Sequence, residues 1–172
     1  MPNTRIKISI FLNYFLFAIL LNSVGTVILQ VQRFFKVAES SASILEACKD
    51  ISIAVASFLV ASFITRIGYK KSMLIALGLM TLSCFIMPFV QTFIAIKILF
   101  AVTGTCFGLT KVSVFGVIGL ITKDEKEHIS VMSFIESFFM VGILAGYFIF
   151  SYYKKRLNKT HYADVLFLIL CY

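Results

Sequence analysis

Two ionisable residues lie deep inside apolar stretches of the sequence, where charge is costly and usually serves a function. Lys111 stands about ten residues before the end of one apolar run, and Glu136 about eight residues after the start of the next. The end of the first of these runs and the start of the next lie at the same membrane surface. Helical rise places Lys111 ~15 Å and Glu136 ~12 Å from that surface. We expect the two side chains to pair, because a lone charge in a low-dielectric medium needs a partner or loses its charge.

Two roles suit such a pair, and the sequence leaves both open. In the first, Lys111 binds an anionic or polyol solute while Glu136 exchanges a proton. In the second, the two residues form a structural ion pair that fixes the register of their helices. The amides of Asn22 and Gln30, in the first apolar run, add hydrogen-bonding groups that suit either a sugar or contacts between helices.

The composition places these residues in a membrane protein. Of the 172 residues, 60% are hydrophobic, 14% are charged and only two are proline, whereas about a quarter of the residues of soluble proteins are charged. An apolar helix needs about 20 residues to cross a hydrocarbon core of about 30 Å. We expect five such spans at about 8–31, 44–64, 72–90, 93–121 and 129–152, and a partial sixth at 163–172. The predicted fold is an all-α polytopic transmembrane bundle that forms a single domain.

The spacing of the runs predicts internal symmetry and an orientation. The first and fourth runs start about 85 residues apart, and the basic clusters at Arg66 and Lys154 are separated by a similar distance. Such an offset is typical of the inverted three-helix repeats of secondary transporters. Lysine and arginine favour cytoplasmic loops, and the early helices usually decide the orientation. A cytoplasmic N-terminus puts seven lysines and arginines on the inner side and six on the outer side, which is nearly a tie. Four of the six outer charges come in the last complete loop, so we predict a cytoplasmic N-terminus.

Residues 65–71 read TRIGYKK, which we expect to form a loop between the second and third spans. The segment and its flanks resemble the loop G-x-L-A-D-R-x-G-R-[RK]-x-x-L of the major facilitator superfamily of transporters. Arg66, Gly68 and Lys70 match the pattern. The departures are Ala61, Thr65 and Tyr69. Thr65 replaces an aspartate that helps to control the inside gate in the family, so the resemblance implies an altered gate here.

The resemblance also implies a function. Together with TGTCFG in the fourth run, the IGYKK form is similar to the fucose/proton symporter-like branch. Family members bind substrate at mid-membrane between two helical halves. The chain is then expected to be a truncated N-terminal half of a secondary active transporter for a sugar, a sugar derivative or an organic anion. In this form we expect it to be inactive alone. The alternative is a small multi-span membrane protein that acts as a binding or assembly partner, or a half-transporter that pairs with a second chain.

Other classes of protein find no support in the sequence. It contains no P-loop, nucleophile elbow or HExxH motif, so we do not expect an enzyme. The four cysteines lack CxxC or Cys/His spacing, and neither a metal nor a cofactor is expected. Most of the basic residues behind the net charge of +8 are scattered through the gaps between the apolar runs, which predicts membrane lipid rather than nucleic acid as a partner. The resemblance to the fucose/proton symporter-like branch implies a location in the inner (plasma) membrane of a bacterium.

Two glycine pairs predict where helices approach closely. Gly104 with Gly108, in the fourth run, and Gly142 with Gly146, in the fifth, each have GxxxG spacing. This spacing puts both glycines of a pair on one helix face, where the backbone of another helix can contact them. We expect close packing inside the bundle at both places.

Overall fold

A computed structural model describes residues 7–21, 28, 39–86, 89–90 and 92–157. All of the regular structure in these residues is helical, which confirms the predicted all-α class. The long elements are the N-terminal helix Lys7–Leu21, α2 (Glu39–Ile67), α3 (Tyr69–Ile86), α4 (Phe93–Ile121) and α5 (Glu125–Leu157).

Four helices of the described part are long and apolar enough to cross a membrane. They are Ser43–Ile67, Tyr69–Ile86, Phe93–Ile121 and Glu125–Ile149. The predicted run 93–121 matches α4 at both ends. The predicted run 8–31 is seen as the helix Lys7–Leu21. Most of its remainder, and the partial span 163–172, lie outside the described residues, so the count of five spans and the inverted repeats stay predictions.

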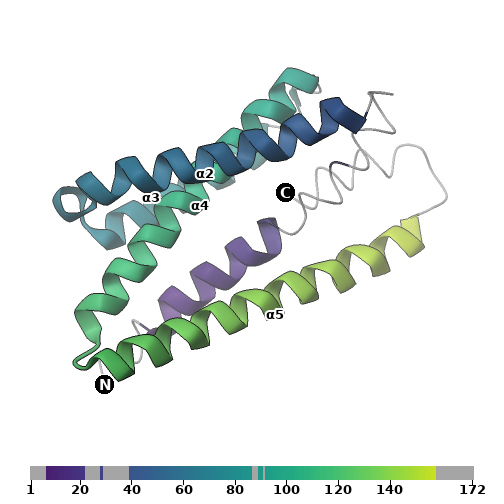
Figure 1. The fold of residues 1–172 in the computed structure, drawn as a ribbon. Helices are drawn as coiled ribbons and strands as arrows, with labels where there is room; N and C mark the ends of the chain where they lie inside the picture. The colour runs from purple at the N-terminus through teal and green to yellow at the C-terminus, as the bar shows by residue number, and fades with distance from the viewer. Residues whose placement is uncertain (1–6, 22–27, 29–38, 87–88, 91, 158–172) are drawn as a thin grey trace.

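Helix α4 is the centre of the bundle and packs against α2, α3 and α5. Figure 1 shows α2 and α3 along one side of α4, while the N-terminal helix and α5 run next to each other on the other side. Helix α4 supplies many of the fully buried side chains, including Phe100, Cys106 and Val114. The elements that carry Lys111 and Glu136 are therefore the central helix and the helix that follows it.

Glycines allow α2 to lie directly against α4. A Cβ atom at Gly104 would collide with the backbone oxygen of Lys49 and lie 3.0 Å from the Cβ of Ser52. A Cβ atom at Gly108 would lie 3.0 Å from the backbone oxygen of Ile53. Both contacts are tighter than side chains normally tolerate, so only glycine fits without moving a helix. The close packing predicted for this pair is confirmed.

The second glycine pair brings α5 against the N-terminal helix. A Cβ atom at Gly142 would lie 2.8 Å from the Cβ of Ala18 and 3.1 Å from the ring of Phe15. Gly146, one turn further along α5, is buried as well. Gly142 thus bears out close packing on α5, and the contact fixes how these two helices face each other.

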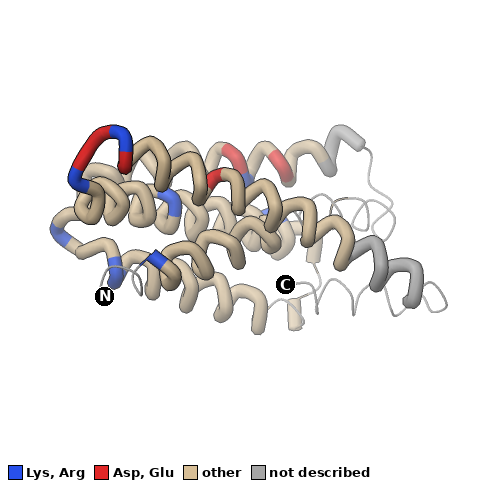
Figure 2. The backbone as a smooth tube through the Cα atoms, turned by 90° about the horizontal axis from the view of Figure 1, so that it is seen from below, with Lys and Arg blue, Asp and Glu red and all other residues tan. Residues whose placement is uncertain are grey.

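Many of the charged residues lie at one end of the bundle, the left end in Figure 2, and others lie farther along the helices. The side chain of Lys7 forms an ion pair with Glu127 of α5, at 3.4 Å. Lys70 and Lys71 line a cavity together with Ser9 of the N-terminal helix. The beginning of the N-terminal helix, the α2–α3 connection and the α4–α5 connection therefore share this end.

Candidate functional site

The ion pair predicted between Lys111 and Glu136 is present. The Nζ atom of Lys111, on α4, lies 3.9 Å from Oε1 of Glu136, on α5. Each side chain is 39% exposed, so the pair is open on one side rather than enclosed by the described helices. The two helices bring the pair together because their connection is short, with α4 ending at Ile121 and α5 beginning at Glu125.

A third group, Tyr14 of the N-terminal helix, completes this polar cluster. Its hydroxyl donates a hydrogen bond to Oε1 of Glu136 at 3.2 Å, and the tyrosine is only 1% exposed. One carboxylate oxygen thus faces both the phenol and the Lys111 ammonium group. Sequence reasoning missed Tyr14, although a phenol within an apolar run signals a buried hydrogen bond. We call Tyr14, Lys111 and Glu136 the polar trio.

Aromatic rings surround the polar trio on its inner side. The ring of Tyr14 lies 4.9 Å from that of Phe139 and 5.9 Å from that of Phe107, between centroids. The ammonium group of Lys111 lies 5.5 Å from the centroid of the Phe115 ring, a distance at which a cation is attracted to the face of an aromatic ring. These rings exclude water from one side of the charges, which strengthens electrostatic interactions there.

One further polar side chain is adjacent to Tyr14 in the sequence. Oδ1 of Asn13, the residue before Tyr14, is buried and has no hydrogen-bond partner among the described residues. Asn22 and Gln30, the predicted hydrogen-bonding amides, lie outside the described residues. Their roles stay predictions.

The segment 65–71 connects the second and third helices as expected, but the expected loop was wrong in extent, because most of these residues are helical. Thr65 and Arg66 belong to α2, Lys70 belongs to α3, and Gly68 alone separates the two helices. The amide of Gly68 donates to the carbonyl of Ile64 at 2.8 Å, as the next residue of α2 would. Its φ of +90° then reverses the chain, a conformation in which glycine is strongly favoured.

This reversal is fixed to the central helix by Tyr69, the residue at which arginine is common in the related pattern. A Cβ atom at Gly116 of α4 would collide with the ring of Tyr69. The side chains of Thr65, Arg66 and Lys70 are exposed. The turn therefore has a fixed base on α4 and an outer surface of exposed polar and basic side chains.

Comparison with known proteins identifies the family. The family model of the Major Facilitator Superfamily matches residues 9–163, a range that includes the polar trio and the α2–α3 turn. Neither a curated protein nor a solved structure gave a significant match. The apolar helices and this match agree on a multi-pass membrane protein. Since the match covers most of the sequence, the chain belongs to the Major Facilitator Superfamily, a family of transporters.

Proposed function

We propose that the protein acts in secondary active transport of a small solute by alternating access, with the polar trio at the solute and proton site. The solute class is a sugar, a sugar derivative or an organic anion. The observation that carries the proposal is the convergence of Lys111, Glu136 and Tyr14 from three helices in a family of transporters. Ionisable residues in membrane helices commonly mark solute and proton pathways.

The geometry supports a division of roles within the trio. While Glu136 is ionised, its carboxylate attracts the ammonium group of Lys111, 3.9 Å away. Protonation of Glu136 removes that attraction and leaves Lys111 available for an anionic group or a hydroxyl of the solute. Tyr14 holds the carboxyl group in place in both states through its hydroxyl. Solute and proton then bind together, as symport requires.

The exposure of the ion pair supports a need for further helices. Lys111 and Glu136 are each 39% exposed, and a charge facing lipid is unfavourable. We therefore propose that a second helical half, in the same assembly, covers this side, and that the 172-residue chain does not transport by itself. The same observation favours the second candidate function, a half-transporter or assembly partner of another membrane protein.

Orientation and branch are part of the proposal as well. The gathering of basic residues from three segments at one end of the bundle supports a cytoplasmic location for that end and for the N-terminus. The IGYKK turn and the TGTCFG stretch support the fucose/proton symporter-like branch, and with it a bacterial inner membrane.

Binding and uptake by the purified chain test these points separately. Radiolabelled sugars, sugar acids and organic anions are screened for binding to the wild type, Lys111→Ala and Lys97→Ala. Lys97 is the matched control, since it lies on the same helix and over the ring of Phe93, at 4.8 Å. We expect Lys111→Ala to lose binding and Lys97→Ala to keep it. Unchanged binding by Lys111→Ala would exclude the solute role of Lys111.

Uptake into liposomes tests the need for a second half. The wild-type chain reconstituted alone is expected to give no uptake of a solute that it binds. Robust uptake by the chain alone would overturn this part of the proposal and leave the site assignment standing.

A further inference from the structure

A groove that is separate from the polar trio lies between the N-terminal helix and the first turns of α5. It has a volume of about 500 Å³ and is lined by Lys7, Ile8 and Phe11 on one side and by Ser130, Phe134 and Phe138 on the other. This volume falls within the range of roughly 300–1,000 Å³ that is typical of ligand sites. The groove is distinct from the polar trio, none of whose members lines it.

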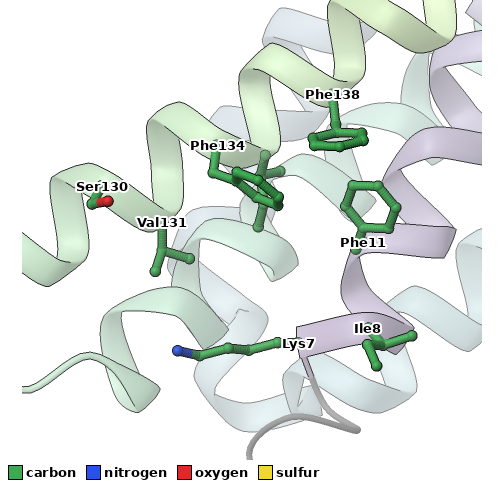
Figure 3. Close-up of a pocket in the computed structure, with 8 residues that line it drawn as sticks. Lys7, Ile8, Phe11, Ser130, Val131, Phe134 and Phe138 are labelled. Carbon is green, nitrogen blue, oxygen red and sulfur yellow. The ribbon is translucent and has the colours of Figure 1, made fainter.

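Aromatic rings form the inner wall of this groove. The ring of Phe11 meets that of Phe138 edge to face at 4.7 Å between centroids, and the rings of Phe134 and Phe138 are also 4.7 Å apart. Figure 3 shows these three rings clustered at one end of the groove, with Lys7 at the other. Phe134 is 57% exposed, so the wall presents apolar surface outward. Such a wall suits a hydrocarbon chain.

Polar groups occur only toward the mouth of the groove. The side chain of Lys7 extends across the mouth and forms an ion pair with Glu127, in which both side chains are about two-fifths exposed. On α5, Ser130, Phe134 and Phe138 line the groove at intervals of four residues, a spacing that makes successive members neighbours on the helix surface. The ammonium group of Lys7, the hydroxyl of Ser130 and two aromatic rings therefore follow one another from the mouth inward.

This order of groups matches the order of groups in a phospholipid. The mouth lies at Lys7 and its ion-pair partner Glu127, at the end of the bundle where the basic residues of three segments gather and where a membrane protein meets the headgroup layer. From Ser130 to Phe138 the helix rises about 12 Å, which is close to the ~15 Å depth of one leaflet of the hydrocarbon core. A phospholipid can therefore place its phosphate at the mouth and one acyl chain along the wall while it stays at its normal depth in the bilayer.

We propose that this groove is a binding site for an anionic phospholipid. The lipid phosphate is held by Lys7 in competition with Glu127, and one acyl chain lies along Phe11, Phe134 and Phe138. The site requires no transport activity, and its occupant comes from the bilayer itself. Because Glu127 competes for the same ammonium group, removal of either charge of the ion pair changes lipid binding, in opposite directions.

The chain contains no tryptophan, so one introduced tryptophan reports on one place. Phe134→Trp puts an indole on the groove wall. The full chain carrying this reporter is reconstituted in bilayers that contain phosphatidylglycerol or phosphatidylcholine with brominated acyl chains, which quench a nearby indole. One favourable lysine at a membrane surface contributes roughly a fivefold preference for anionic lipid. We therefore expect the site reported by the indole to bind brominated phosphatidylglycerol about fivefold more tightly than brominated phosphatidylcholine, as measured by quenching.

Charge variants in the reporter chain separate a specific site from general attraction. Lys7→Gln is expected to abolish most of the preference, whereas Glu127→Gln is expected to increase it. Lys97→Gln is the matched lysine control and is expected to change nothing. A second reporter, Leu74→Trp, lies on α3 four residues after Lys70 and outside the groove. Its lipid preference is expected to be insensitive to Lys7→Gln.

Several results would overturn the proposal. Equal quenching by the two lipids at the Phe134→Trp reporter would show no selectivity, and weak quenching by both would show that protein covers the groove. Equal sensitivity of both reporters to Lys7→Gln would show general surface attraction only. If the reporter variants fail to fold, native mass spectrometry of the unsubstituted chain gives the same comparison. Retention of phosphatidylglycerol over phosphatidylcholine, lost in Lys7→Gln, is expected, and equal retention of both lipids would contradict the site.

Discussion

Replacement of Gly104 by alanine tests the contact between α2 and the central helix. The new Cβ atom would collide with the backbone oxygen of Lys49 and lie 3.0 Å from the Cβ of Ser52. A backbone oxygen cannot rotate away, so the helices must separate, and we place the steric cost at about 3 kcal/mol, the upper part of the usual range for overpacking. The higher helix propensity of alanine returns about 1 kcal/mol. The net expected loss of stability is about 2 kcal/mol.

Gly78→Ala, on α3, is the matched control, because no atom lies within 4 Å of a Cβ atom placed there. The same change in propensity without the collision is expected to stabilise the protein by up to about 1 kcal/mol. Reversible unfolding of the purified protein in mixed micelles, followed by circular dichroism, measures both variants. The expected difference between them is about 3 kcal/mol. Equal stability of Gly104→Ala and Gly78→Ala would refute the close α2–α4 contact.

Three further substitutions test the polar trio and the α2–α3 turn by the same unfolding measurement. Tyr14→Phe removes the hydroxyl that donates to Glu136 at 3.2 Å and is expected to cost about 1 kcal/mol; wild-type stability would argue against this hydrogen bond. Gly116→Ala forces the ring of Tyr69 off α4 and is expected to lower the stability by about 1–3 kcal/mol. Wild-type stability of this variant would show that the ring does not pack against Gly116. Gly68→Ala meets no steric obstacle but must keep a φ of +90°, at a cost of about 1–2 kcal/mol; no loss would mean that the turn is built differently.

The ends of the helices show what hydropathy predicts and what it does not. The bounds of α4 were predicted correctly because its apolar run begins and ends where the helix does. Helix α5 begins at Glu125, before its predicted start, and its first turn contains Glu125 and Glu127. Acidic side chains are favourable at a helix N-terminus, so a helix continues through charges that hydropathy assigns to a loop. The turn at Gly68 was mistaken for a longer loop because hydropathy assigned Arg66, Lys70 and Lys71 to a loop as well, although these residues belong to α2 and α3.

The candidate site was predictable only as far as depth decides it. The pairing of Lys111 with Glu136 followed from their similar distances, along two consecutive helices, from the connection at which α4 ends and α5 begins. Tyr14 lies 122 residues from its hydrogen-bond partner. Its orientation depends on how the N-terminal helix is rotated against α5, which the contact between Gly142 and Ala18 helps to set. A tertiary contact of this kind leaves no local pattern in the sequence.

Proton uptake on solute binding tests the proposed site most directly. A solute that binds the purified chain is added in weakly buffered detergent solution, and the pH change is recorded for the wild type and for Glu136→Gln. We expect solute binding to the wild type to take up protons, and Glu136→Gln to bind the solute without proton uptake, since it mimics the protonated carboxyl group. Equal proton uptake by the wild type and Glu136→Gln would contradict a coupled solute and proton site at Lys111, Glu136 and Tyr14.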